Sequence, residues 1–135
     1  MRDFARRVLI VDPDPVFAGK AMVVLSAEGY DVEAATGITL AAERLKDVDF
    51  GCAIVDEHLP EMRGHEAVPV LKTIAPDVQI IMTAARNSSE LESSIRRRDI
   101  FYYHVKSFGM HELQQAVRDA FRKVGDRTKA RRNGG

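Results

Sequence analysis

The sequence predicts an α/β fold in which about five parallel strands form a doubly wound sheet with helices on both faces. Short apolar runs alternate along the chain with longer stretches whose apolar residues recur at helical spacing. Two of the short runs, within residues 7–12 and 50–56, are continuously apolar, as expected for strands buried on both faces. The links between the two kinds of segment are short, which favours right-handed βαβ units.

Five segments are predicted as strands because they are short, apolar and rich in β-branched or aromatic residues. The first and third strands each end in an aspartate, and the last ends in a lysine. In chain order the predicted strands are Arg7–Asp12, Tyr30–Ala35, Phe50–Asp56, Val78–Thr83 and Phe101–Lys106.

The stretches between the strands are predicted as helices because each can place apolar residues on one side. Gly29 is expected to end the first helix, since glycine readily adopts a left-handed conformation. Pro69 cannot donate a backbone hydrogen bond, so the third helix is expected to begin about one turn before it or to kink there. The predicted helices are Pro15–Gly29, Ile38–Val48, Gly64–Ile74, Ser88–Arg98 and His111–Val124.

Composition excludes several classes of protein. A length of 135 residues fits one domain, and a hydrophobic share of 45% excludes a wholly disordered chain. No apolar run approaches the ~20 residues that span a bilayer, and the N-terminus lacks the apolar core of a signal peptide. The single cysteine, Cys52, cannot form an internal disulfide and is expected in the core. We therefore expect a soluble, cytoplasmic protein without a membrane association.

Basic residues gather at the C-terminal end, although the formal net charge of the whole chain is zero. From Arg118 onward there are seven basic and two acidic side chains, so this part carries +5 and the rest must carry −5. Such a tail could contact nucleic acid or anionic lipid, but a solvated terminus is the favoured interpretation and nucleic-acid binding is unlikely for an acidic body. We expect one domain over residues 1–125 and a basic, flexible tail over 126–135.

Polar side chains follow the predicted strands and are expected to meet at one edge of the sheet. They are Asp12 and Asp14 after the first strand, Asp56 after the third, Thr83 after the fourth and Lys106 after the fifth. Clustered carboxylates favour a hard divalent cation such as Mg²⁺, and a lysine supplies a fixed positive charge. This combination suits phosphoryl transfer onto a carboxylate.

Four short motifs resemble those of the receiver domains of two-component response regulators, and the resemblance covers about residues 7–124. Asp12-Pro13-Asp14-Pro15 resembles the acidic first loop of that family. The segment 54–64 is similar to its phosphoacceptor block, 81–84 to its switch threonine and the small residue after it, and 103–106 to its aromatic residue and lysine. The resemblance implies the flavodoxin-like strand order 2-1-3-4-5.

The resemblance also implies roles for individual residues. Asp56 would accept a phosphoryl group from a phosphohistidine, and Asp12 and Asp56 would hold Mg²⁺ with the backbone carbonyl of His58. Lys106 would pair with Asp56 and then with the phosphoryl group, to which Thr83 would donate a hydrogen bond. The aromatic residue of the last motif, Tyr103, would rotate inward and change the surface of the last strand and the last two helices.

The partners implied by the resemblance are proteins. A sensor histidine kinase or a phosphotransfer protein would supply the phosphoryl group, and an unidentified downstream protein or a second copy in a homodimer would receive the signal. The chain would be a phosphoacceptor and not an enzyme, with at most self-phosphorylation and self-dephosphorylation. Few residues follow the last predicted helix, so a stand-alone regulator is expected.

Three positions depart from the family pattern, and one of them, Asp99-Ile100 in place of a glycine-alanine turn, is expected to cost little. Pro13 stands where the family has a second acid that contacts the metal, so Mg²⁺ is expected to bind weakly. Asp14 lies one residue further, where its side chain is directed differently, and it is not expected simply to replace the missing acid. Ser107 stands where a proline normally follows the lysine. We expect a trans bond before it, because a cis bond before serine costs about 2.5–4 kcal/mol; Lys106 should still reach Asp56.

Other interpretations remain open at this point. The main alternative is a pseudo-receiver, a protein-binding module that has lost phosphorylation because of Pro13. A flavodoxin-like cofactor binder is less favoured, because the first loop has acids and prolines where a phosphate site needs glycine, serine or threonine. An aspartyl-nucleophile phosphatase would lack room for a cap. The four histidines show no metal-ligand spacing and are expected at the surface or at an interface.

Overall fold

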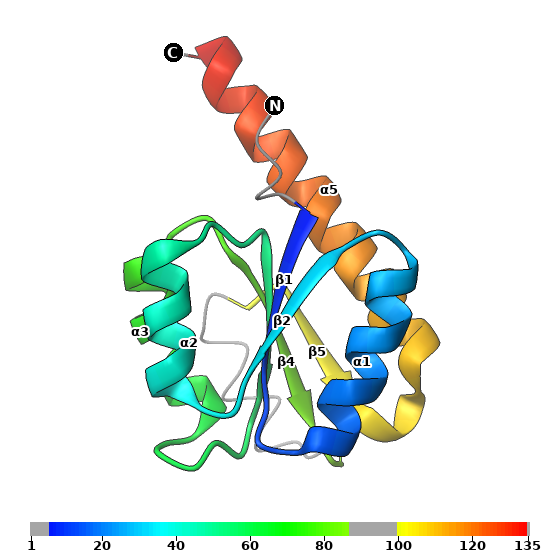
Figure 1. Ribbon diagram of the computed structural model, residues 1–135. Helices are drawn as coiled ribbons and strands as arrows, with labels where there is room; N and C mark the ends of the chain where they lie inside the picture. The colour runs from blue at the N-terminus through cyan, green and yellow to red at the C-terminus, as the bar shows by residue number, and fades with distance from the viewer. Residues whose placement is uncertain (1–5, 87–99, 135) are drawn as a thin grey trace.

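The computed structural model describes residues 6–86 and 100–134, and the side chains of residues 6–86 and 100–125 (Figure 1). Five parallel strands form one sheet in the order β2-β1-β3-β4-β5, which confirms the predicted architecture. The register is continuous across the sheet, and Val11 lies opposite Val55. The strands are β1 (Arg7–Val11), β2 (Asp31–Ala35), β3 (Cys52–Asp56), β4 (Gln79–Ala84) and β5 (Tyr102–Val105).

Helices cover both faces of this sheet. Figure 1 shows α1 and α5 on one side and α2 and α3 on the other. The elements are α1 (Pro15–Ala27), α2 (Ile38–Asp47), α3 (Gly64–Ile74), a 3-10 turn η2 (Lys106–Phe108) and α5 (Met110–Gly134). The helix predicted over Ser88–Arg98 lies outside the described residues.

Successive side chains of a strand point to opposite faces of the sheet, so alternate residues of each strand belong to two separate apolar cores. On β1, Leu9 packs into the cluster beneath α2 and α3, whereas Val8 packs into the cluster beneath α1 and α5. Cys52 belongs to the second cluster and is fully buried, which confirms its predicted place in the core. Burial raises the pKa of the Cys52 thiol, so this cysteine is inert as a nucleophile.

The helix boundaries agree with the sequence pattern where a local signal existed. Gly29, which follows α1, has a φ of 95°, the left-handed conformation that was expected of a helix stop. α3 begins at Gly64, slightly more than one turn before Pro69, so the proline lies inside the helix close to its start.

α5 is longer than the sequence analysis predicted. It was expected to end at Val124, but the helix continues to Gly134 and projects beyond the sheet (Figure 1). Arginine, lysine and alanine are frequent after Val124 and all favour a helix, which explains the extension even without an apolar face. The expected tail over 126–135 therefore has helical backbone over its described part, and its flexibility stays a prediction. None of the described helices combines the length and apolar character needed to cross a membrane.

Candidate functional site at the carboxyl edge of the sheet

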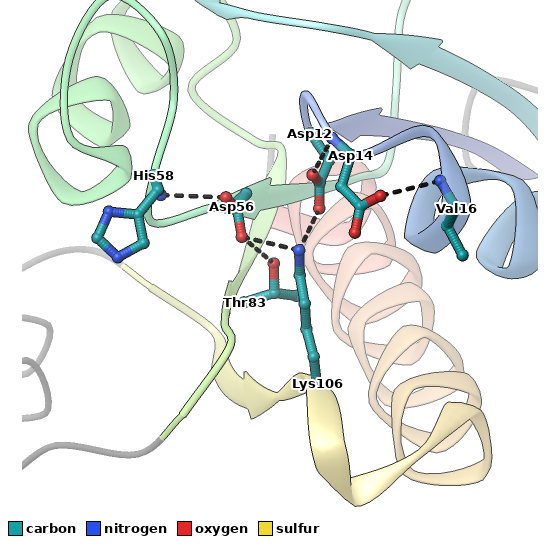
Figure 2. Close-up of polar contacts among 7 residues, drawn as sticks. All are labelled: Asp12, Asp14, Val16, Asp56, His58, Thr83 and Lys106. Carbon is teal, nitrogen blue, oxygen red and sulfur yellow. Dashed lines mark hydrogen bonds and ion pairs between the residues drawn. The ribbon is translucent and has the colours of Figure 1, made fainter.

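Four of the predicted site residues come together at the carboxyl ends of the strands (Figure 2). Asp12 directly follows β1, Asp56 is the last residue of β3, Thr83 lies near the end of β4, and Lys106 directly follows β5. Asp56 is the register partner of Thr83, so the pairing of two central strands sets these side chains next to each other. The sheet topology therefore assembles a cluster from residues that are far apart in sequence.

Lys106 joins the two carboxylates of this cluster. Its Nζ lies 2.9 Å from Oδ2 of Asp12 and 3.1 Å from Oδ1 of Asp56 (Figure 2). Burial alone would lower the pKa of Lys106, but the contacts with Asp12 and Asp56 outweigh it and raise the pKa above its ordinary value. The lysine is therefore a permanent cation between two acids, and its predicted reach to Asp56 is confirmed.

The peptide bond after Lys106 is trans, as predicted. The chain turns through η2 and reaches Gly109, whose φ of 92° is left-handed. Glycine tolerates this conformation without strain, so the route from β5 to α5 needs no proline after the lysine.

Asp56 is held by donors from three different elements. Thr83 Oγ1 donates to Oδ1 at 3.5 Å, and the backbone N–H of His58 donates to Oδ2 at 3.1 Å. Lys106 adds the ion pair described above. Thr83 is fully buried, and Asp56 is 6% exposed at the surface of the edge. The carboxylate is thus fixed in orientation, while one side of it still meets solvent.

Asp12 is the more buried of the two acids and is less well compensated. Its Oδ1 accepts a hydrogen bond of 2.8 Å from the backbone N–H of Asp14. Burial raises the pKa of the Asp12 carboxyl above its usual value; Lys106 opposes this effect, and the charge of Asp56 adds to it. The net rise therefore comes mainly from the burial of the carboxylate.

The first loop, between β1 and α1, is organised by local contacts. Asp14 is the N-cap of α1 and accepts a hydrogen bond of 3.0 Å from Val16 N–H (Figure 2). Pro15 occupies the first helical position, where its missing N–H costs nothing. Pro13 is exposed between the two aspartates. Asp14 thus has a structural task in starting α1, which agrees with the expectation that it does not simply replace the missing acid.

The β3–α3 loop, residues 57–63, is attached to its surroundings at several points. The N–H of Glu57 donates to the carbonyl of Thr83 at 2.8 Å. The buried carboxylate of Glu57 contacts Nδ1 of His65 on α3. Within the loop, Arg63 donates to Nδ1 of His58 at 2.8 Å. These contacts fix the backbone of the residues that follow Asp56.

Glu61 attaches the same loop to α2. Its carboxylate accepts hydrogen bonds from the N–H groups of Ile38 at 3.1 Å and Thr39 at 3.5 Å. The N-cap of α2 is Gly37, which has no side chain to cap the helix, so Glu61 supplies the cap from 23 residues away. The bonds from Ile38 and Thr39 lower the pKa of Glu61 below its ordinary value.

The donor set of this edge fits a hard divalent cation. The carboxylates of Asp12 and Asp56 and the backbone carbonyl of His58 are oxygen ligands of the type that Mg²⁺ prefers. Two carboxylates lie around a single ammonium group, so an additional cation would further balance their charge. Within the described residues, no three His, Cys, Asp or Glu side chains gather into a metal site. A cation bound at this edge would meet two carboxylates, and backbone or water oxygens would have to supply its other ligands.

Tyr103 and the histidines lie around this cluster in different environments. Tyr103 is half-buried against the core beneath α2 and α3, and its hydroxyl donates to the carbonyl of Arg86 at 3.4 Å. His58 and His111 are exposed, as predicted. His104 is fully buried, so its predicted surface position is wrong. It is the third of the four residues of β5, and its Nδ1 is 3.0 Å from the Glu112 carboxylate on α5, so one of the two nitrogens of the buried ring is paired.

Two contacts of the site were not foreseen from the sequence. The ring of Phe17 on α1 lies beneath Lys106, with its centroid 4.4 Å from Nζ. Phe17 looks like one more apolar residue of an amphipathic helix, and no pattern distinguishes it. Glu61 looks like a solvated loop acid, since its partners on α2 are distant in sequence. Only the tertiary structure identifies either residue.

Comparison with known proteins places this geometry in a family. The sequence pattern of the response regulator receiver domain matches residues 8–118. The chain is 26% identical over 116 residues to the DNA-binding transcriptional regulator NtrC of Azospirillum brasilense; the match covers 86% of this chain and 24% of NtrC. The chain spans between about a quarter and about half of the length of the curated relatives it matches.

Solved structures share the fold. A CheY-like receiver domain protein from Methanospirillum hungatei has a TM-score of 0.83 at 24% identity, covering 90% of this chain and 97% of the other. A response regulator from Burkholderia pseudomallei, solved with a phosphorylated aspartic acid, a calcium ion and citrate, has a TM-score of 0.77 at 22% identity, covering 90% and 72%. The matched pattern and the shared topology lead to one conclusion: this chain belongs to the response regulator receiver domain family.

Proposed function

We propose that the protein is a phosphoacceptor in which Asp56 receives a phosphoryl group from the phosphohistidine of a sensor kinase or phosphotransfer protein. The observation that carries the proposal is the position of Lys106, which contacts Asp56 and Asp12 at 3.1 and 2.9 Å. An ion pair that only stabilises the fold needs one acid. Phosphoryl transfer instead needs a cation next to the accepting carboxylate, together with a second acid near that cation.

The reaction can be written for the groups of this edge. An oxygen of the Asp56 carboxylate attacks phosphorus, the P–N bond to the donor imidazole breaks, and the imidazole leaves as the neutral base after taking a proton. The product is an acyl phosphate on Asp56. A bound Mg²⁺, held by Asp12, Asp56 and the carbonyl of His58, would neutralise charge on the phosphoryl oxygens.

Two further residues act on the product. Lys106 turns from the carboxylate to the new phosphoryl oxygens, and Thr83, whose hydroxyl already lies 3.5 Å from Asp56 Oδ1, donates a hydrogen bond to them. The movement of Thr83 opens space behind it, into which Tyr103 rotates from its hydrogen bond with Arg86. The surface of β5 and α5 changes as a result, and this surface is the output toward a protein partner or a second copy.

The direct test is the intact mass of the protein after incubation with acetyl phosphate and Mg²⁺. We expect the gain of one phosphoryl group in the wild type, no gain in Asp56→Asn, and no gain when EDTA replaces Mg²⁺. Asp47→Asn changes an exposed acid at the end of α2 and serves as the matched control that still labels. An unchanged mass of the wild type would favour a pseudo-receiver, a binding module that works without phosphorylation.

A further inference from the structure

Lys106 has a third neighbour that the acceptor chemistry leaves unexplained. Its Nζ lies over the face of the Phe17 ring, 4.4 Å from the centroid. The electron-rich face of a phenyl ring attracts an ammonium group, and the attraction is greater where water is partly excluded. The Lys106 side chain is 18% exposed, so this contact occurs in a mostly desolvated place.

Phe17 is itself held rigidly. It is buried in the apolar cluster between the sheet and helices α1 and α5. It also lies in the first turn of α1, whose start is set by the cap from Asp14 and by Pro15 at the first helical position. The ring is therefore a fixed surface, whereas Lys106 follows the last strand and has four rotatable side-chain bonds.

Charge alone does not fix where the ammonium lies. Asp12 and Asp56 attract Nζ from neighbouring directions, and a flexible lysine could satisfy either acid from many positions. The ring adds a contact from a different direction, beneath the side chain. Three contacts that converge from β1, β3 and α1 define one position for Nζ between the acids.

We propose that Phe17 is a positioning residue for Lys106, which it holds by a cation–π contact at the place where the lysine meets the incoming phosphoryl group. The inference rests on the proposed phosphoacceptor function, because it assigns Phe17 a part in the same site. It also gives the first loop a purpose: Asp14 and Pro15 start α1 so that Phe17 lies beneath the lysine.

The test compares Phe17→Leu with Phe50→Leu. Both remove a buried ring, but Phe50 belongs to the core on the opposite face of the sheet. The first readout is the NMR signal of the Lys106 ε-protons, which a ring face 4.4 Å away shifts upfield. We expect this shift in the wild type and in Phe50→Leu, and its loss in Phe17→Leu.

The second readout is the rate of labelling by acetyl phosphate with Mg²⁺. We expect Phe17→Leu to lower the rate about fivefold, equivalent to ~1 kcal/mol, which lies within the range for a partly exposed cation–π contact. Phe50→Leu should keep the wild-type rate, and Phe17→Tyr, which restores a ring face, should label faster than Phe17→Leu.

Several results would overturn the inference. They are a wild-type Lys106 signal without an upfield shift, equal labelling of Phe17→Leu and wild type, an equal slowing in both leucine variants, and a Phe17→Tyr rate no better than that of Phe17→Leu. A wild type that does not label at all would contradict the proposed function, while the NMR comparison still decides the contact itself. The two failures are therefore distinguishable.

Discussion

The two loops that flank Asp56 are held in opposite ways. The first loop, between β1 and α1, is closed by neighbours in sequence: Asp12 accepts from Asp14, and Asp14 accepts from Val16. The β3–α3 loop is closed by distant partners, among them β4 through the backbone of Glu57 and α2 through Glu61. Both loops border the same carboxylates. The distant contacts of the first loop are made by Asp12, with Ala35 on β2 and with Lys106, whereas the second loop is attached at several points along its length.

This difference bears on Pro13, the departure from the family pattern that lies in the first loop. A loop that is held locally can exchange one residue, as at Pro13, while its neighbours keep their contacts. A loop that is attached at several distant points loses more when one residue changes. We therefore expect substitutions in the β3–α3 loop to affect folding, and substitutions in the first loop to affect mainly the binding of a cation.

The largest effect is expected from Gly64→Ala at the end of the β3–α3 loop. A Cβ on Gly64 would lie 2.3 Å from the backbone oxygen of Asp56, so the backbone must shift. We expect the free energy of unfolding to fall by about 3 kcal/mol, at the upper end of the usual cost of overpacking. Urea denaturation measures this change.

A matched control is Gly19→Ala, because a Cβ there meets nothing within 4 Å and the residue is exposed on α1. It should raise stability by up to ~1 kcal/mol, as alanine favours a helix more than glycine. Equal stability of Gly64→Ala and the wild type would show that the β3–α3 loop is not held tightly at this point.

The next effect concerns the first loop. Pro13→Asp adds a charged oxygen ligand beside Asp12, so Mg²⁺ should bind about tenfold more tightly, equivalent to ~1.4 kcal/mol. Isothermal titration calorimetry measures the affinity. Pro13→Asn, which introduces a side chain of the same size without the charge, is the control and should give a smaller gain. The same affinity in Pro13→Asp as in the wild type would mean that another oxygen already fills this position.

Asp14→Ala separates the structural and the metal-binding interpretations of Asp14. Loss of the N-cap should lower the free energy of unfolding by about 1 kcal/mol. The affinity for Mg²⁺ should stay at the wild-type value, because the carboxylate is used by α1. A fall in affinity with no fall in stability would identify Asp14 as a metal ligand and refute the capping interpretation.

The smallest effect is expected from Glu61→Gln, and it should depend on pH. The pKa of Glu61 is lowered from 4.5 by the N–H groups of α2, so the folded state favours its ionised form. The stabilisation is therefore present above about pH 4.5 and is lost as the pH falls through the lowered pKa of the folded state.

Thermal unfolding should show the wild type with a slightly higher Tm than Glu61→Gln at pH 7, and the difference should shrink toward acid pH. Glu43→Gln, an exposed acid on α2 itself, is the control and should show no such trend. A difference that grows as the pH falls would contradict the assignment of Glu61 as the cap.

The elements that the sequence predicted well are those with a local physical cause. Strand β3 ends at Asp56 and β5 ends just before Lys106, because a buried run must stop where charge begins. Gly29 ends α1 because its backbone is left-handed. The meeting of Asp12, Asp56, Thr83 and Lys106 was predictable for the same reason, since parallel strands present their carboxyl ends at one edge.

The features that could not be predicted from the sequence depend on contacts between residues that are far apart along the chain. Glu61 caps a helix 23 residues away, and Phe17 contacts a lysine from the far end of the sheet. His104 is buried because Glu112 on another element accepts its ring N–H, which no pattern within β5 reveals. The end of α5 was also missed, because apolar periodicity stops at Val124 while the intrinsic helix preference of the basic residues continues.

Because α5 is long, a small tilt at its first residue would displace its last residue by a much larger distance. Its 25 residues extend over roughly 37 Å at about 1.5 Å per residue. The helix begins at Met110, which is separated from Lys106 only by the rest of the η2 turn and Gly109. A tilt of about 10° at this residue would carry the far end through roughly 6 Å over such a length. A displacement of atomic size at the carboxyl edge can therefore be amplified into one as large as a side chain at the tip, without any change within the helix.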